Sequence, residues 1–403
     1  MPEKTYNIAI VAPTPFHYHA PFYQKIANTD GIDLMVYYCS NETILGVEVE
    51  KMYLSKGIMA KKEDILSGYK YKFLKNYSLS PSFMNWPFGL VNFGIINELR
   101  YNKYDAVVIQ SWTNFTWWLI SLICLIYKIP LVFMTDSNIL GEISKSKLKL
   151  KLKNFLLGWF LFKHASGFLT SGTNNEEFYK HYGVPEKKII RMPFSWGYES
   201  FLDESEKIGS HRQLSREKMN LGINDFVILY VGRFSEEKCP MLLLESYHLI
   251  KNPHKKLFFV GDGILRKELE KYIIDNNVAG VDFFGFQQKE SLFNFYNVAD
   301  VLVMPSKRET WGIVVNEAMC FGLPIITSSK VGAAIDLVKN GLNGFLFESE
   351  NKKELAEKIE LMMNLPREEL TLLGINSKKI IMDWVLSYNP SVQLKKLLTL
   401  IQS

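Results

Sequence analysis

The stretch SKRETWGIVVNEAM, residues 306–319, combines two carboxylates with a turn. Glu309 and Glu317 stand eight positions apart, and between them Trp311, which we expect to be exposed, precedes Gly312. If a helix starts near Gly312, its free N–H groups face phosphate or sugar oxygens. Glu317 then lies just over one turn inside the helix, where its carboxylate can accept two hydrogen bonds from a vicinal diol, and Glu309 can reach another hydroxyl-bearing group. The helix dipole also favours a carboxylate there, so Glu317 has a purely structural explanation as well.

Two cations, Arg233 and Lys238, flank the turn into a helix whose early Pro240 suits a first-turn position. The helix dipole repels cations at that end, so their presence makes sense if an anion binds there. A diphosphate fits, because the guanidinium offers a planar fork and the lysine a point charge, and both oppose the charge on a departing phosphate. Alternatively, both side chains simply point into solvent. With the two glutamates they predict a site for phosphate, a diol and a second polyol, which are the parts of a nucleotide sugar.

Short β-rich runs alternate with helical runs along the chain, a pattern typical of parallel sheets with crossover helices. In the second half we expect strands at residues 226–232, 256–261, 281–285, 301–305 and 324–328, with helices that start near residues 240, 263, 289, 312 and 333. In the first half we expect strands at residues 6–12, 33–38, 105–110, 130–134, 167–171 and 188–193, and helices near residues 23–29, 115–127, 148–163 and 175–182. Residues 41–87 are irregular in pattern and suggest a long loop region, which often shapes a binding site.

Ligands bind at the carboxyl ends of the strands in such sheets, and the candidate residues do follow strands. Four loops at one edge of one domain describe a single pocket. The glycines in these loops allow a close approach of the backbone to a ligand, although strand-to-helix turns of any α/β protein also use glycine. The loop residues besides the four charged ones are Gly232, Gly261, Asp262, Gly263, Gly285, Phe286, Gln287, Thr310, Trp311, Gly312 and Ile313.

The bulk composition is that of an ordinary globular protein. The chain has 403 residues, of which 47% are apolar and 22% charged, and its length favours two domains. Apolar periodicity disappears around residues 196–216, which we therefore expect to mark the domain boundary. A net charge of +5 is mild for this size, and no motif indicates a nucleic-acid partner.

Further patterns bear on the cellular setting. The four cysteines, Cys39, Cys124, Cys239 and Cys320, lie far apart in apolar surroundings and are expected to be reduced core residues. The N-terminal sequence lacks the pattern of a signal peptide, so a cytosolic location is expected. The apolar stretch 115–134 is interrupted by Lys128 and Pro130 and suits a buried helix followed by a strand better than a membrane span.

The motifs VGRFSEEKCP, FFVGDG, VDFFGF, SKRETWGIVVNEAMCFGLPIITS and VGAAIDLVKNGLNGFLF together resemble the second domain of glycosyltransferase family 4, over roughly residues 226–348. This family comprises retaining nucleotide-sugar transferases. The resemblance implies the GT-B fold, an α/β architecture of two doubly wound Rossmann-like domains facing a central cleft. It implies an acceptor-binding domain at residues 1–200, a donor-binding domain at 201–375, and a C-terminal helix at 376–403 that crosses back to the first domain.

The same resemblance implies roles for single residues. Arg233 and Lys238 would bind the diphosphate, Glu309 the donor sugar, and Glu317 the ribose. Backbone from Thr310 to Ile313 would touch sugar and phosphate, and residues 285–287 would border the nucleobase. The reaction would be a metal-independent retaining transfer to a glycan or lipid-linked glycan, without a cofactor, and no Asp-x-Asp loop that would hold a metal follows a strand in the expected position.

The first half departs from the family pattern, since APTPFHYHAPF stands where many members have a Gly-Gly loop. His17 and His19 follow the first strand and can assist the acceptor hydroxyl, and Asp136, after another strand, is a comparable candidate. A lone histidine more often has a structural role, and each of these two can have one here. The candidates for catalysis are thus Arg233, Lys238, Glu309, His17 and Asp136.

Residues 144–164, SKSKLKLKLKNFLLGWFLFKH, place lysines beside an apolar stripe. Such a helix can dock peripherally on anionic lipid, which suits a lipid-linked acceptor, or it can be a buried crossover helix with a solvated lysine rim.

Two other functions remain to be weighed against the transferase. One is a sugar-nucleotide epimerase or phosphorylase on the same two-domain plan, against which Glu309 and Glu317 argue. The other is a non-catalytic nucleotide-sugar-binding protein, which would be expected to have lost part of the set Arg233, Lys238 and Glu309.

Overall fold

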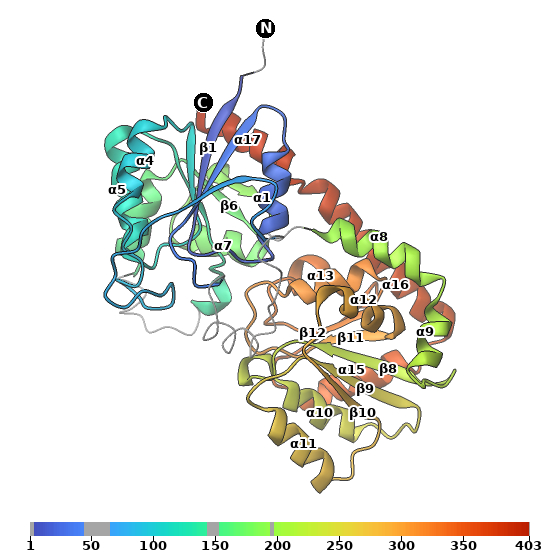
Figure 1. Ribbon diagram of the computed structural model, residues 1–403. Helices are drawn as coiled ribbons and strands as arrows, with labels where there is room; N and C mark the ends of the chain where they lie inside the picture. Colours follow the sequence, from blue (N-terminus) through green and yellow to red (C-terminus); the bar gives the residue numbers. More distant parts are fainter. Residues whose placement is uncertain (1–3, 44–64, 143–152, 194–196, 403) are drawn as a thin grey trace. The chain divides into compact units, whose positions relative to one another are not determined.

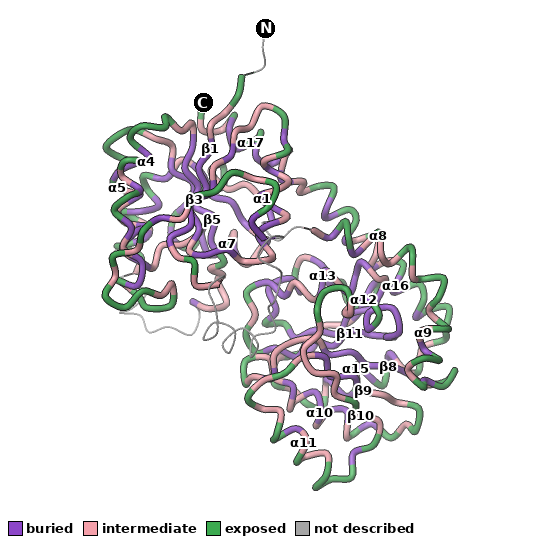
Figure 2. Tube along the Cα trace, in the orientation of Figure 1, coloured by how far each residue is buried: buried purple, intermediate pink, exposed green. Residues whose placement is uncertain are grey.

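The computed structural model describes residues 4–43, 65–142, 153–193 and 197–402, which form two compact units. Unit 1 contains the described residues up to 193 together with residues 388–402, and unit 2 contains residues 197–387. In each unit a parallel sheet lies between helices, and the buried residues concentrate on its strands (Figures 1 and 2). The chain therefore has the α/β architecture expected from the alternation of strands and helices.

Unit 1 is built on a seven-stranded parallel sheet with the order β3-β2-β1-β4-β5-β6-β7. The strands are β1 Tyr6–Ala12, β2 Ile32–Tyr38, β3 Lys70–Phe73, β4 Ala106–Ile109, β5 Leu131–Met134, β6 Gly167–Thr170 and β7 Ile189–Arg191. The α-helices are α1 Ala20–Ala27, α4 Ile95–Tyr101, α5 Phe115–Tyr127, α7 Thr173–His181 and α17 Pro390–Gln402. Shorter turns are η1 Ile139–Gly141 and η3 Glu186–Lys188, and η2 Phe155–Phe162 is a π-helix. Every residue of β4, β5 and β6 is buried, as expected for strands covered by helices on both faces.

Unit 2 repeats this plan with a six-stranded parallel sheet of order β10-β9-β8-β11-β12-β13. The strands are β8 Phe226–Val231, β9 Lys255–Val260, β10 Val281–Gly285, β11 Val301–Met304, β12 Ile325–Ser328 and β13 Gly344–Phe347. The helices are α8 Tyr198–Gly209, α9 Arg212–Lys218, η4 Glu236–Lys238, α10 Pro240–Leu249, α11 Arg266–Asp275, α12 Lys289–Val298, α13 Ile313–Cys320, α14 Ala334–Leu337, α15 Lys352–Met363 and α16 Arg367–Ser387. This strand order is the doubly wound arrangement of dinucleotide-binding folds.

The last helix, α17, packs on unit 1 although unit 2 precedes it in the chain. It contacts α1, β6 and β7, and the Ser391 and Thr29 hydroxyls are hydrogen-bonded at 2.7 Å. Gly167 of β6 leaves room for the buried side chain of Leu397, because a Cβ at this glycine would lie 2.6 Å from Leu397 Cδ1. The returning segment was expected to start at residue 376, whereas residues up to Ser387 belong to unit 2 and only the following residues return.

The structure adds elements that the sequence pattern did not predict. The irregular region 41–87 contains the short edge strand β3, and its residues 44–64 lie outside the described residues. The polar region 196–216, expected only as a boundary, forms the helices α8 and α9 of unit 2. Their polar composition reflects largely solvent-exposed surfaces, since few residues of either helix are buried. Helix α4 and strand β13 were also not expected.

Cys39, Cys124 and Cys320 are buried free thiols, as expected, whereas Cys239 is only half-buried and stands at the start of α10. Among the described residues, no helix is both long enough and apolar enough to span a bilayer.

The packing of α17 leads to a first prediction. Leu397→Ala is expected to destabilise unit 1 by about 2–5 kcal/mol, because it leaves a cavity at a fully buried position. Val392→Ala is the matched control, since Val392 lies on the same helix with half of its surface exposed. Urea denaturation followed by tryptophan fluorescence measures both. Equal midpoints for the two variants would contradict the packing described.

Candidate functional site

The strand order of unit 2 brings together the loops that follow β8 and β11. These two strands are neighbours, with Ile228 opposite Val301. After β8 the chain continues to β9 and β10 on one side of β8, and it then returns to form β11 on the opposite side of β8. At such a switch point the two following loops diverge and leave a crevice in which doubly wound sheets bind their ligands. Arg233 and Lys238 lie in the first loop, and Glu309 lies in the second.

The beginnings of the same two strands are held by one buried carboxylate. Asp300, directly before β11, accepts a hydrogen bond from the Val227 backbone N–H of β8 at 2.8 Å. Its oxygens also accept from Arg212 at 2.8 Å and from Arg216 at 3.1 Å, and both arginines belong to α9. Helix α9, which lies in the polar region expected to be the domain boundary, thus fixes the register of β8 and β11.

Backbone hydrogen bonds join all four candidate loops. They link Gly232 N–H to Val260 O at 3.0 Å, Phe234 N–H to Asp262 O at 2.9 Å, Gly261 N–H to Gly285 O at 2.8 Å and Lys307 N–H to Glu237 O at 3.0 Å. The loops expected to lie at one edge of the sheet are therefore in direct contact, and each holds its neighbour in place.

Gly261 and Gly263 allow the loop after β9 to approach the loop after β8. A Cβ at Gly261 would lie 1.9 Å from the Gly232 carbonyl oxygen, and one at Gly263 would lie 2.5 Å from that of Phe234. Gly261 also has φ +136°, in the region that favours glycine. Close backbone approach was expected at these glycines, and in unit 2 the approaching partner is the adjacent loop.

Lys238 and Glu309 form an ion pair across the switch point, between Lys238 Nζ and Glu309 Oε2. Burial, followed by the nearby Arg233 charge, lowers the pKa of Lys238 to about 8, and the charge of Glu237 opposes this shift. The contact with Glu309 also favours the charged ammonium. Arg233, like Lys238, is half-buried. The two positive groups repel each other, and a bound anion would relieve that repulsion.

The Glu309 loop is held from its other side by the segment after β12. The Glu309 N–H donates to Lys330 O at 3.3 Å, and the Gly332 N–H donates to Glu309 O at 3.1 Å. A Cβ at Gly332 would lie 1.9 Å from the Thr310 carbonyl oxygen, so only glycine fits. Sequence reasoning did not single out Gly332, because nothing local in the sequence reveals which loop its backbone meets.

Trp311 is buried, which corrects the expectation of an exposed tryptophan. Its ring stacks on Trp384 of α16 with centroids 5.5 Å apart, and its Nε1–H donates to Asn316 Oδ1 at 3.0 Å. The side chain therefore anchors the loop to the body of unit 2. Helix α13 begins at Ile313, directly after Gly312 with φ +97°, as the sequence predicted, and Thr310 is exposed on the loop.

Glu317 is half-buried, on α13. One carboxylate oxygen, Oε2, accepts a hydrogen bond from the Tyr296 hydroxyl of α12 at 2.7 Å. Burial raises the pKa of Glu317, and the hydrogen bond from Tyr296 opposes that shift. Tyr296 orients the carboxylate, and sequence reasoning missed this residue because the contact joins two separate helices.

Asp262, Phe286 and Gln287 also belong to these loops. Asp262 is exposed, and its carboxylate accepts a hydrogen bond from the Gly263 N–H at 2.7 Å. Phe286 is half-buried, and the Gln287 side chain donates to Phe284 O at 2.6 Å. Because Gln287 is turned back onto its own loop, its backbone is better placed than its amide to meet a ligand.

His17, His19 and Asp136 belong to unit 1, at the carboxyl ends of its strands. His19 is buried among aromatic rings, and burial, followed by His17, lowers its pKa to about 3, which makes it a poor base near neutral pH. His17 is half-buried. Asp136 reaches solvent, but the dense protein around it disfavours the charged form and raises its pKa to about 6. His17 and Asp136 are thus the stronger candidates for proton transfer. Among the described residues, no three His, Cys, Asp or Glu side chains are grouped so as to hold a metal.

Comparison with known proteins identifies the domain that carries the charged loops. Residues 211–380 match the family of glycosyl transferases group 1. An uncharacterized glycosyltransferase of Methanocaldococcus jannaschii is 31% identical over 57% of this chain and 59% of its own length. An alpha-1,4-N-acetyl-D-galactosaminyltransferase of Campylobacter jejuni, named for an undecaprenol-linked acceptor, is 29% identical over 73% of this chain and 75% of its own length.

The fold itself is shared with solved structures. HepE of Anabaena, in complex with UDP and glucose, superposes with a TM-score of 0.67 over 98% of this chain and 99% of HepE, at 18% identity. At that identity the likeness shows the fold alone, namely two Rossmann-like domains of the GT-B type.

Gly261→Ala is expected to displace the loops after β8 and β9, because its Cβ would collide with the Gly232 carbonyl. The free energy of unfolding of unit 2 should fall by about 1–3 kcal/mol, and pyrophosphate binding should weaken. The control is Gly209→Ala, since a Cβ there meets no atom within 4 Å. Urea denaturation and calorimetric titration measure these effects. If the two variants behave alike, the close approach of the loops is refuted.

The lowered pKa of Lys238 predicts a pH-dependent affinity for pyrophosphate. The ammonium is charged below a pKa of about 8 and neutral above it, so affinity should fall as the pH rises through and beyond 8. Lys238→Arg keeps its charge and should not show this fall. Calorimetry between pH 6 and 10 measures the affinity of both proteins for pyrophosphate. The effect of the ionisation of pyrophosphate is the same for both proteins, so it cancels in the ratio of the two affinities. A constant ratio would contradict a loss of charge on Lys238 near pH 8 that weakens pyrophosphate binding.

Proposed function

We propose that this chain, whose residues 211–380 match the glycosyl transferases group 1 family, is a transferase that moves a sugar from a nucleoside diphosphate sugar to a glycan or lipid-linked glycan acceptor. The anomeric configuration of the sugar is retained. In this proposal unit 2 binds the donor, and unit 1 binds the acceptor.

One observation carries the proposal. Arg233, Lys238 and Glu309 converge on the β8–β11 switch point, where the ion pair between Lys238 and Glu309 joins the two loops. Glu309 is the carboxylate that contacts the Lys238 ammonium, and a diphosphate that takes its place there can be bound by both cations. The carboxylate is then free to turn to a sugar hydroxyl as the phosphate takes its place on Lys238.

Each remaining part of the donor has a proposed partner. Glu317, oriented by Tyr296, accepts hydrogen bonds from the ribose diol, and backbone near Gly285 borders the base. Backbone from Thr310 to Ile313 contacts sugar and phosphate. UDP is the first nucleotide to test, because the fold is that of HepE, whose crystal structure contains UDP and glucose. The Campylobacter jejuni relative supports a lipid-linked acceptor.

The chemical step follows from these positions. The acceptor oxygen forms a bond to the anomeric carbon while the bond from that carbon to the phosphate oxygen breaks, and the departing nucleoside diphosphate takes up the acceptor proton on the same face. Arg233 and Lys238 stabilise the negative charge on the leaving diphosphate. The two cations thereby do what a bound metal ion would otherwise do. Glu309 positions the sugar, and His17 or Asp136 of unit 1 orients the acceptor hydroxyl.

The proposal predicts selective binding of one nucleoside diphosphate. A thermal-shift screen against UDP, GDP, ADP, CDP and dTDP should raise the unfolding temperature with one of them, since a ligand at 100 times its dissociation constant adds about 2.7 kcal/mol. Arg233→Ala should lose the effect. Lys271→Ala, at an exposed lysine of the same unit, should keep it. The matching labelled nucleotide sugars then test for transfer to lipid extracts.

Failure of all five nucleotides to stabilise the wild type at millimolar concentration would contradict donor binding. Binding that survives in Arg233→Ala would place the nucleotide elsewhere on the chain. Binding without release of nucleotide in the presence of any lipid or glycan fraction would favour a nucleotide-sugar-binding protein over a transferase.

A further inference from the structure

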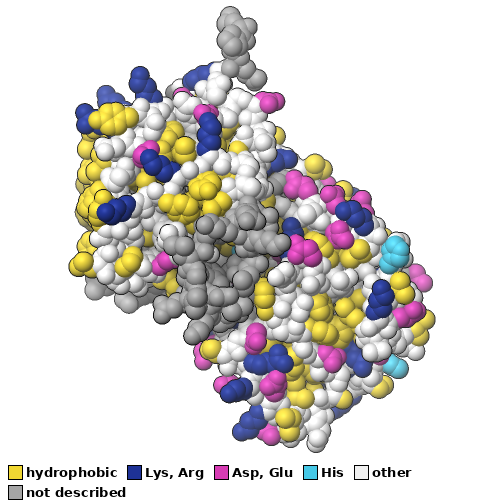
Figure 3. All heavy atoms as spheres, in the orientation of Figure 1, with side chains coloured by type: hydrophobic (Ala, Val, Ile, Leu, Met, Phe, Trp, Pro, Cys, Tyr) yellow, Lys and Arg dark blue, Asp and Glu magenta, His cyan; other side chains and the backbone are white. Residues whose placement is uncertain are grey.

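Unit 1 exposes a continuous set of large apolar side chains on two neighbouring helices. Trp159 and Phe155 of η2 are 59% and 57% exposed, and Ile126 of α5 is 62% exposed. We call this surface the α5–η2 face. Its residues are Leu122, Leu125, Ile126, Tyr127, Phe155, Leu156, Trp159 and Phe160. Figure 3 shows hydrophobic side chains along the left edge of unit 1, where Figure 1 places α5.

Both helices already bury a different apolar side against the sheet. On η2 the buried residues are Leu157, Leu161 and Phe162, and on α5 they include Trp117 and Ile120. Packing within unit 1 therefore does not explain the exposed half. A helix that is apolar all round normally meets an apolar environment on every side, so the α5–η2 face calls for a partner.

The two helices form one surface. The rings of Trp118 on α5 and Phe160 on η2 stack with centroids 6.0 Å apart, and Phe155 stacks on Trp159 at 5.4 Å. A hollow of about 240 Å³ between the helices is lined by residues of both, among them Leu122. Because these contacts order the aromatic rings before any partner arrives, little side-chain entropy remains to be lost on docking.

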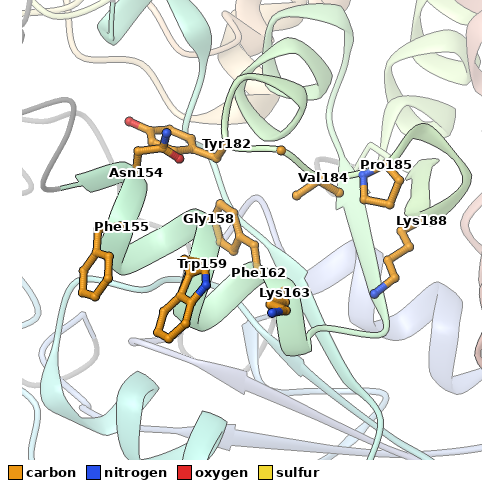
Figure 4. A pocket seen from close by; sticks show the side chains of 11 residues that line it. Asn154, Phe155, Gly158, Trp159, Phe162, Lys163, Tyr182, Val184, Pro185 and Lys188 are labelled. Carbon is orange, nitrogen blue, oxygen red and sulfur yellow. The ribbon is translucent and has the colours of Figure 1, made fainter.

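The charges around this surface are positive. Lys128 ends α5 and Lys163 follows η2, where its ammonium lies 5.6 Å from the Trp159 ring centre. Beside η2 runs a groove of about 870 Å³ that is also lined by Lys188 (Figure 4). Neither helix contains an acidic residue, and among the residues that the structure describes no acidic one lines the groove or the hollow.

Two acidic residues of this part of the chain, one before and one after η2, are ion-paired. Glu142 is buried and accepts hydrogen bonds from Lys153 at 2.6 Å and from Tyr182 at 2.7 Å. Glu186 lies 3.6 Å from Lys180. The positive charges of Lys128 and Lys163 thus face solvent beside an apolar surface.

We propose that the α5–η2 face docks on an anionic lipid bilayer, with its aromatic and aliphatic side chains among the acyl chains and Lys128, Lys163 and Lys188 at the headgroups. Aromatic rings beside lysines match the boundary between hydrocarbon and headgroups. A second copy of the chain fits less well, because a symmetric contact of this face with itself would bring the lysine rims together.

The inference does not depend on the donor site, since α5 and η2 belong to unit 1 and the group 1 domain lies within unit 2. It concerns the described part of the lysine-rich region, and residues 144–152 of that region lie outside the described residues. If the acceptor is lipid-linked, docking would bring the enzyme to the surface in which that acceptor is embedded.

Flotation of the full-length chain with vesicles tests the docking. One set contains phosphatidylcholine alone, and the other contains equal parts of phosphatidylcholine and phosphatidylglycerol. The chain is expected to float with the anionic vesicles at low salt and to bind less at high salt. Phe155→Ser/Trp159→Ser should lower the partition coefficient at least about tenfold, and Lys128→Gln/Lys163→Gln about fivefold for each lysine removed.

Matched controls are Ile264→Ser and Lys271→Gln, exposed positions of unit 2 that should leave binding unchanged. A circular dichroism melt of each variant shows that it is folded. Nucleotide stabilisation, which reports on unit 2, keeps failure of docking distinct from failure of donor binding. Absence of flotation by the wild type at low salt would overturn the proposal. Full binding by Phe155→Ser/Trp159→Ser would also overturn it. A wild-type chain that is a dimer, with the double variant a monomer, would do so as well, because the face would then contact a second copy of the chain.

Discussion

The order of the strands in unit 2 decides which side chains can meet. Because β8 lies between β9 and β11, the loop with Arg233 and Lys238 and the loop with Glu309 leave the sheet side by side although about 70 residues separate them in the chain. All other features of the site depend on this adjacency. Asp300 fixes the starts of the two strands, glycines allow the loops to touch, and Trp311 fastens the second loop to α16.

The electrostatics of this arrangement suit a ligand with several anionic oxygens. Burial weakens the hold of Lys238 on its proton, and the charge of Arg233 repels its ammonium. Glu309, which contacts the ammonium, and the charge of Glu237 both favour the protonated form. An anion that replaces the carboxylate on Lys238 would be attracted by two cations and would release Glu309 toward a hydroxyl group. Binding of phosphate and orientation of a sugar would thus be coupled through one side chain.

The sequence predicted the sheets well because apolar β-rich runs and the residues after them are local features. The strands around Val301 and Ile228, the helix start after Gly312 and the meeting of four loops were all confirmed. The sequence did not predict contacts between residues that lie far apart in the chain. Trp311 was predicted to be exposed because its partner Trp384 lies far along the chain, and Tyr296 and Gly332 went unnoticed because only the tertiary fold brings them to the site.

Calorimetry of Lys238→Met with the nucleoside diphosphate that stabilises the wild type, and with the corresponding nucleoside, tests the central claim most directly. If Lys238 binds the diphosphate, the substitution should lower affinity for the diphosphate about 10- to 100-fold, the loss expected for a charged hydrogen bond, and leave affinity for the nucleoside unchanged. An equal loss for both ligands, or no loss for either, would contradict a phosphate site at the switch point between β8 and β11.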